Sequence, residues 1–208
     1  MSQEYHDGQR AWQNRFDTRR LADRLAESTR DFINPQHKAF IERRDMFFLA
    51  TANEHGWPEC SYKGGEPGFV RVLDEHTLAF PLYEGNGMYL SSGNLSVNPK
   101  VALLFVDFEG GTRLRLSGTA QIDAGDPLIA SYPGAQLVVR VRVREIFSNC
   151  RRYVHRYRLV ERSRFVPNAK GEAPVPDWKR DPWFEGTLPA NDRALDPDNP
   201  SAPSLPQF

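Results

Sequence analysis

The sequence predicts a mainly β fold with flanking helices, of the α+β class, whose strands form an antiparallel barrel. Helix-length segments come first in the chain. From residue 46 onward, short apolar segments follow one another, separated by breaks that contain Gly or Asp. Many short strands with tight connections are typical of a barrel. A chain of 208 residues is long enough for one substantial core.

Residues 1–45 are expected to form helices packed on the barrel. The segment FDTRRLADRLAESTRDFI offers Asp17 or Thr18 as an N-cap. Its larger apolar residues lie along one side of a helix: Leu21, Leu25 and Phe32. In NPQHKAFIERRD, Asn34 is a suitable cap and Pro35 suits the first turn.

The barrel domain is expected within residues 46–165. Seven segments have the composition of strands: MFFLATA, ECSYKGG, FVRVL, TLAFPLY, VALLFVDF, RLRLSGTAQI and QLVVRVRVREIF. The segment MYLSSGNLSVN, between the fourth and fifth strands, has the length of a helix and is stopped by Pro99. VALLFVDF is apolar on both faces, so a helix or a second subunit is expected to cover its outer face.

Residues 166–208 hold nine of the sixteen prolines, a composition typical of disordered segments. Trp178, Trp183 and Phe184 argue against a free tail, because large apolar rings gain stability only by burial. A Pro-rich C-terminal tail docked on the domain or on a partner subunit is therefore expected.

The composition limits the possible partners and location. Lys plus Arg equals Asp plus Glu at 27 each, which gives no support for binding nucleic acid or a membrane surface. The N-terminus lacks the apolar core of a signal peptide. The two cysteines, Cys60 and Cys150, are far apart in the sequence and are interpreted as small buried hydrophobes. A cytoplasmic location fits best.

One segment points to a ligand. EGNGMYLSSGN, residues 84–94, lets the backbone approach an anion through its glycines and places free N–H groups at the start of a helix. Pro81 interrupts the preceding strand, so a bulge is expected there, and Lys63 precedes two glycines. The alternatives are a plain strand-to-helix turn and a solvated lysine. The five histidines are scattered, so no metal site is expected.

The order of these elements resembles that of the pyridoxamine 5′-phosphate oxidase-like flavoproteins. The resemblance is strong from Phe40 to Ile122 and is carried by the GN…NLSVNPKVALLF block and the RLRLSGTA strand; it extends more weakly through FSNCRRYVHR. It implies a split β-barrel of the FMN-binding type and a homodimer with flavin sites at the interface. It also implies the cofactor-binding residues Ser61, Tyr62, Lys63, Gly64, Arg71, Phe80, Pro81, Asn86, Gly87, Met88, Ser91, Asn94, Arg113 and Arg115.

Two departures weaken the link to vitamin B6 chemistry. The oxidase proper has an Arg-Lys pair in its phosphate loop, where this chain has Asn86 and Gly87, and its C-terminal Arg-x-His signature has no counterpart here. The resemblance therefore implies an FMN-dependent oxidoreductase for an unidentified small molecule, with an electron donor such as NAD(P)H. The alternatives are a non-catalytic FMN-binding or flavin-sensing protein, a deazaflavin-dependent reductase and, less strongly, a plain interaction protein without a cofactor.

Overall fold

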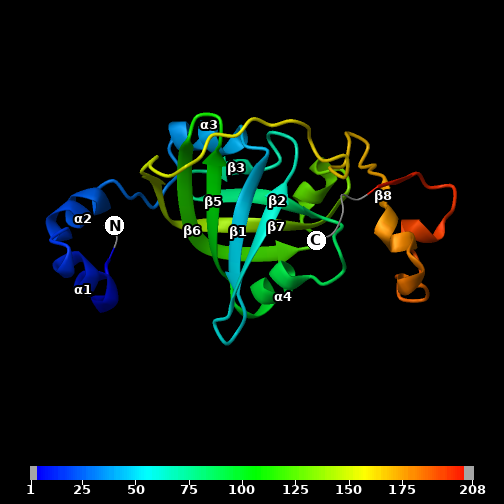
Figure 1. Ribbon diagram of the computed structural model, residues 1–208, viewed down its shortest axis with the longest axis horizontal. Coiled ribbons are helices and arrows are strands. Elements are labelled where there is room, and N and C mark those ends of the chain that lie inside the picture. The colour runs from blue at the N-terminus through cyan, green and yellow to red at the C-terminus, as the bar shows by residue number, and fades with distance from the viewer. Residues whose placement is uncertain (1–3, 204–208) are drawn as a thin grey trace.

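The structure is a computed structural model that describes residues 4–203, so the extreme ends of the two expected terminal segments lie outside the described residues. Seven strands form one antiparallel sheet in the order β2-β1-β5-β6-β7-β4-β3 (Figure 1). They are β1 Met46–Ala52, β2 Pro58–Gly64, β3 Arg71–Asp74, β4 Thr77–Tyr83, β5 Lys100–Asp107, β6 Thr112–Asp123 and β7 Ala135–Asn149. All seven expected strands are therefore confirmed.

Four α-helices accompany the sheet: α1 Asp7–Arg15, α2 Arg19–Ala26, α3 Pro35–Glu42 and α4 Leu90–Val97. The start of α3 follows the expected chemistry, because the Asn34 side chain accepts a hydrogen bond from the His37 N–H and Pro35 occupies the first turn. Helix α4 lies within the segment expected from the sequence. Helix α1 was not expected, because its nine residues are polar and show no apolar stripe.

Strands β6 and β7 pair along almost their whole lengths and belong to both halves of the barrel. β5 pairs with the first part of β6, whereas β4 pairs with the first part of β7. The register shifts between Ser117 and Gly118, and a bulge of this kind bends a strand and increases its twist. The bend lets the two halves of the sheet enclose one core.

Aromatic rings occupy the centre of that core. Phe47 is fully buried, and its ring lies 5.9 Å from Phe69, 4.9 Å from Phe80 and 5.2 Å from Phe105, measured between ring centroids. Ile41 of α3 joins the same cluster. The core therefore draws on both halves of the sheet and on α3.

The sheet does not close, because its edge strands β2 and β3 do not pair with each other. Helix α3 covers the β3 edge: the Lys38 ammonium donates to the Val72 carbonyl, and the Glu42 carboxylate accepts from the Val72 N–H. The fold is the expected mainly β, α+β arrangement, an antiparallel split barrel. No helix in residues 4–203 is long and apolar enough to cross a membrane.

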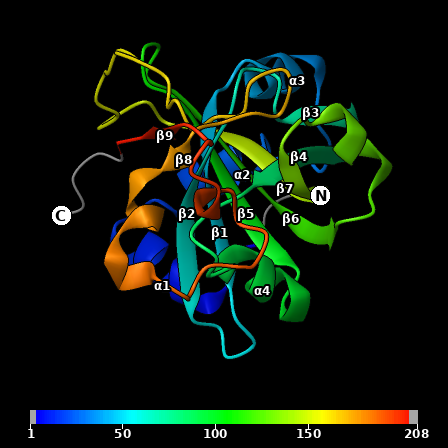
Figure 2. The same ribbon diagram turned by 90° about the vertical axis from the view of Figure 1, so that its right-hand side faces the viewer.

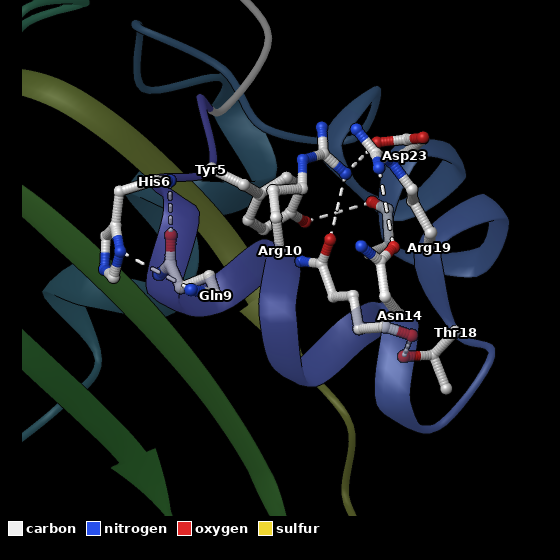
Figure 3. Close-up of polar contacts among 10 residues, drawn as sticks. Tyr5, His6, Gln9, Arg10, Asn14, Thr18, Arg19 and Asp23 are labelled. Atoms are coloured by element: carbon white, nitrogen blue, oxygen red, sulfur yellow. Dashed lines mark hydrogen bonds and ion pairs between the residues drawn. The ribbon is translucent and has the colours of Figure 1, made fainter.

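Helices α1 and α2 form an N-terminal hairpin that projects from one end of the barrel (Figure 1). Polar side chains join the two helices (Figure 3): the Arg10 guanidinium contacts the Asp23 carboxylate at 2.7 Å, and the Tyr5 hydroxyl donates to the Ala22 carbonyl. Leu21 and Leu25 are more than half exposed. The apolar side of α2 therefore does not pack on the barrel of its own chain.

The C-terminal segment runs from the barrel to the opposite end of the molecule, as Figures 1 and 2 show. Residues 175–203, here called the tail lobe, contain the strands β8 Val175–Pro176 and β9 Ser201–Ala202, which pair in parallel. Three short 3-10 helices lie between them: η2 Asp177–Arg180, η3 Pro182–Phe184 and η4 Arg193–Leu195. The ring of Trp183 stacks edge-on against Phe184 but remains 80% exposed.

Candidate functional site

A cavity of about 430 Å³ lies in the split of the barrel, and we call it the split pocket. Strand β2 forms one wall, and the end of β4 with the start of β7 forms the other. The loop after β4 and the first residues of α4 complete it. Its volume falls within the range of about 300–1,000 Å³ that is typical of small-molecule sites. The lining residues are Glu59, Ser61, Tyr62, Lys63, Gly64, Pro81, Leu82, Tyr83, Glu84, Gly85, Asn86, Gly87, Tyr89, Leu90, Ser91, Ser92, Gln136 and Leu137.

A chain of hydrogen bonds crosses the β2 wall of the split pocket. Ser91 Oγ accepts from Lys63 Nζ at 3.1 Å and lies 3.1 Å from Ser61 Oγ. It also donates to Glu59 Oε2 at 3.2 Å. Because a hydroxyl carries only one proton, Ser61 must be the donor in its contact with Ser91. Thr51 Oγ1 also donates to Glu59, so that carboxylate is held from two sides.

Lys63 provides the cation of the split pocket. Burial lowers the pKa of its ammonium, and the neighbouring Glu59 carboxylate opposes that shift. Lys63 forms no ion pair with an acidic residue in the described part of the chain, and its only acceptor there is Ser91 Oγ. Two of the three ammonium protons are therefore left for a ligand. An anion at this position would gain both a hydrogen bond and a charge partner.

The loop between β4 and α4 forms the rim of the split pocket. Gly87 has a φ of +79°, a conformation that a side chain would strain. Asn86 Oδ1 accepts from the Met88 N–H at 3.1 Å, which holds the turn. Strand β3 pairs with β4 only as far as Ala79, so the second half of β4 is a sheet edge, where Pro81 is tolerated. The register shift expected near this proline occurs between Leu82 and Tyr83.

Of the fourteen residues assigned to the cofactor from the sequence, eight line the split pocket. They come from β2, β4, the loop and α4: Ser61, Tyr62, Lys63, Gly64, Pro81, Asn86, Gly87 and Ser91. The other six lie elsewhere: Arg71, Phe80, Met88, Asn94, Arg113 and Arg115.

The structure gives each of these six a different setting. Phe80 points into the core against Phe47, because it lies on the opposite face of β4 from its neighbour Pro81. The Arg71 guanidinium donates to Ser131 Oγ and its carbonyl, and it stacks on the Tyr132 ring.

Asn94 lies behind the pocket wall, where its amide donates to Thr51 Oγ1 at 2.9 Å. Met88 is exposed beside the rim. Arg113 and Arg115 lie on β6 and do not reach the split pocket of their own chain. The buried Nε of Arg113 has no hydrogen-bond partner among the described residues.

Sequence reasoning missed several lining residues. Glu59 stands two residues before Ser61, so the alternation of β2 places both on the same face and makes Glu59 detectable from the sequence. Gln136 and Leu137 have no such signal, because the β4–β7 register brings them to the pocket.

Cys60 and Cys150 are both exposed, so their interpretation as buried hydrophobes is wrong. Each lies at an outward-facing position, Cys60 on an edge strand and Cys150 just beyond β7. Residues 4–203 contain no group of three metal-ligating side chains.

These features define an open antiparallel barrel whose split holds a pocket lined by the ammonium of Lys63. A family model described as pyridoxamine 5′-phosphate oxidase matches residues 33–150, more than half of the chain. The chain therefore belongs to this family, as the resemblance predicted.

Several solved structures are similar to part of this chain. One is a putative pyridoxamine 5′-phosphate oxidase from Lactobacillus delbrueckii, with 23% identity over 57% of this chain and 95% of that chain and a TM-score of 0.47. HupZ of Group A Streptococcus has 22% identity over 56% and 93%, with a TM-score of 0.47. HutZ, the heme storage protein of Vibrio cholerae, has 18% identity over 55% and 93%, with a TM-score of 0.40. No curated protein sequence matches the chain.

Proposed function

We propose that this protein is an FMN-dependent oxidoreductase that acts on a small molecule and takes electrons from a donor such as NAD(P)H. Membership of the family supports a flavin. The single observation that carries the proposal is the Lys63 ammonium, which faces a pocket of about 430 Å³ and forms no ion pair with the described residues. The terminal phosphate of FMN is the group that such a cation would bind.

The residues of the split pocket fit both ends of such a cofactor. Lys63 would hold the phosphate, with Asn86 on the facing rim. Pro81 and Leu137 provide an apolar surface for a flat ring. When bound, FMN supplies the electron-transfer chemistry, and the protein positions it and excludes water. No pyrophosphate fingerprint was found in the sequence, which favours FMN over an adenine dinucleotide.

The proposal includes a homodimer with the cofactor sites at the interface. Apolar and aromatic side chains are exposed around the mouth of the split pocket: Tyr62, Met88, Tyr89 and Leu90. Leu104, on the outer face of β5, remains partly exposed in one chain. A second copy would cover these residues, and its Arg115 would then be available to an anion bound in the neighbouring site.

The first test is the absorbance spectrum of the purified protein, followed by release and identification of any bound cofactor. FMN is expected. A deazaflavin bound more tightly than FMN, or haem, would contradict the proposed cofactor. Reduction of the bound flavin by NADH or NADPH, with catalytic reoxidation by an acceptor, separates an enzyme from a flavin-storing or flavin-sensing protein.

The second test assigns the phosphate site. Lys63→Ala is expected to weaken FMN binding by about 1 to 3 kcal/mol, which is about 5- to 150-fold in Kd, because a charge-assisted hydrogen bond is lost. Riboflavin, which lacks the phosphate, should bind almost equally well to both proteins. Lys100→Ala is the matched control, since Lys100 is exposed and does not line the split pocket. Equal losses for FMN and riboflavin would place Lys63 away from the phosphate.

A further inference from the structure

The tail lobe contains a buried lysine that reaches the rim of the split pocket. Lys179, in η2, is only 7% exposed. Its ammonium donates to the Glu84 carboxylate and to Asp192 Oδ2, the latter at 2.8 Å. Asp192 in turn caps η4 by accepting from the Ala194 N–H. One cation from the tail is therefore shared between a carboxylate of its own lobe and a carboxylate of the barrel.

Glu84 is the residue that connects this cluster to the candidate site. It is the first residue after β4, and it lines both the split pocket and a smaller cavity of about 90 Å³ beneath the tail. Lys179 and Asp192 line the smaller cavity. The ion pair thus lies between the two cavities, and the loop that carries Asn86 and Gly87 begins at Glu84.

The two carboxylates that accept from Lys179 favour its charged form. Burial lowers the pKa of its ammonium, but the hydrogen bonds to Asp192 and Glu84 outweigh that effect and leave the pKa above its ordinary value. The side chain of Asp192 is almost fully buried, whereas that of Glu84 is about half exposed. Without Lys179, the Glu84 carboxylate would remain at the rim without this counter-charge, and a carboxylate repels an incoming anion.

We propose that Lys179 is a positioning residue for anion binding, by which the tail lobe neutralises Glu84 and fixes the rim of the split pocket. The inference rests on the proposed function, because the anion is the FMN phosphate. It gives the C-terminal segment a role other than covering the site: the tail supplies charge to a loop that is 95 residues distant in the sequence.

The test compares FMN and riboflavin affinities in the full-length protein. Lys179→Met should weaken FMN binding about fivefold or more, because a partly exposed carboxylate is left beside the phosphate. Riboflavin affinity should be nearly unchanged. Adding Glu84→Gln to Lys179→Met should restore FMN affinity, since the uncompensated charge is then removed. Arg162→Met is the matched control, because Arg162 also joins the C-terminal segment to the barrel, through Glu66, but does not contact the rim.

A single substitution covers the case in which Lys179→Met does not fold. Glu84→Gln in the folded protein should raise the ratio of FMN affinity to riboflavin affinity, and a fall in that ratio would overturn the inference. Equal losses for both ligands in Lys179→Met, without rescue by Glu84→Gln, would show that Lys179 only anchors the tail. An FMN affinity of Lys179→Met equal to that of the wild type would also overturn it. Failure of the wild type to bind either ligand would overturn the proposed function itself.

Discussion

Gly118 is the residue at which the barrel bends. A Cβ built there would lie 2.1 Å from the Arg142 carbonyl oxygen, which is backbone and cannot turn away. Gly118→Ala should therefore force β6 and β7 apart at the bulge and destabilise the fold by about 1 to 3 kcal/mol or more. Urea unfolding followed by circular dichroism measures the change.

Gly93 is the matched control for this substitution. It lies in α4, is exposed, and a Cβ there would meet nothing within 4 Å. Gly93→Ala should stabilise the protein by up to about 1 kcal/mol, because alanine is the better helix former. Similar effects of the two substitutions would mean that the bulge adapts to a side chain.

The sequence pointed to residues of the pocket lining where one strand or one loop places the side chains, and their binding of a cofactor stays a prediction. Ser61 and Lys63 follow from the alternation of β2, and Asn86 and Gly87 from the loop. The residues placed by long-range contacts could not be found. Neither Gln136 at the start of β7 nor Lys179 in the tail has a local signal that points to the pocket. Their positions depend on strand register and on how the tail lobe docks.

At the scale of elements, α2 and α3 show that a similar apolar pattern leads to different burial. Ile41 of α3 is fully buried in the barrel core, whereas Leu25 of α2 is 58% exposed. Ile41→Ala should cost about 2 to 5 kcal/mol of stability, as expected for a core truncation. Leu25→Ala should change stability by less than about 0.5 kcal/mol.

Thermal and urea unfolding at low and high protein concentrations test this pair. A large loss of stability for Leu25→Ala that appears only at high protein concentration would mean that a second copy covers the N-terminal hairpin. A large loss at every concentration would contradict the position of the hairpin away from the barrel.

The strands were predictable because each carries its own signal of β-branched and apolar residues between turn residues. Helix α1 was missed because its helical signals are polar: the His6 side chain accepts from the Gln9 N–H, and Gln9 reaches back to the His6 N–H. A docked tail was expected from Trp178, Trp183 and Phe184, but the elements of the tail lobe were not, since its prolines are typical of a disordered segment. Its order comes from tertiary contacts such as the Lys179–Asp192 ion pair. The division into N-terminal helices, barrel and tail stays a prediction.

At the scale of the whole molecule, the two terminal units lie at opposite ends of the barrel (Figure 1). Exposed apolar residues surround the mouth of the split pocket. Neither unit covers that mouth: no residue of α1, α2 or the tail lobe lines the split pocket. A second copy related by a twofold axis would bury these apolar residues together with the partly exposed face of β5.

The protein is expected to be an obligate homodimer with two equivalent sites. Arg115 is exposed on β6 and has no acidic partner among the described residues, so Arg115→Glu should lower FMN affinity without unfolding the barrel. Arg43→Glu, at the exposed end of α3, should leave the affinity unchanged and is the matched control. Sedimentation at submicromolar concentration, with and without FMN, measures the assembly. A monomer that binds FMN stoichiometrically would contradict the dimer, because each site would then be complete within one chain.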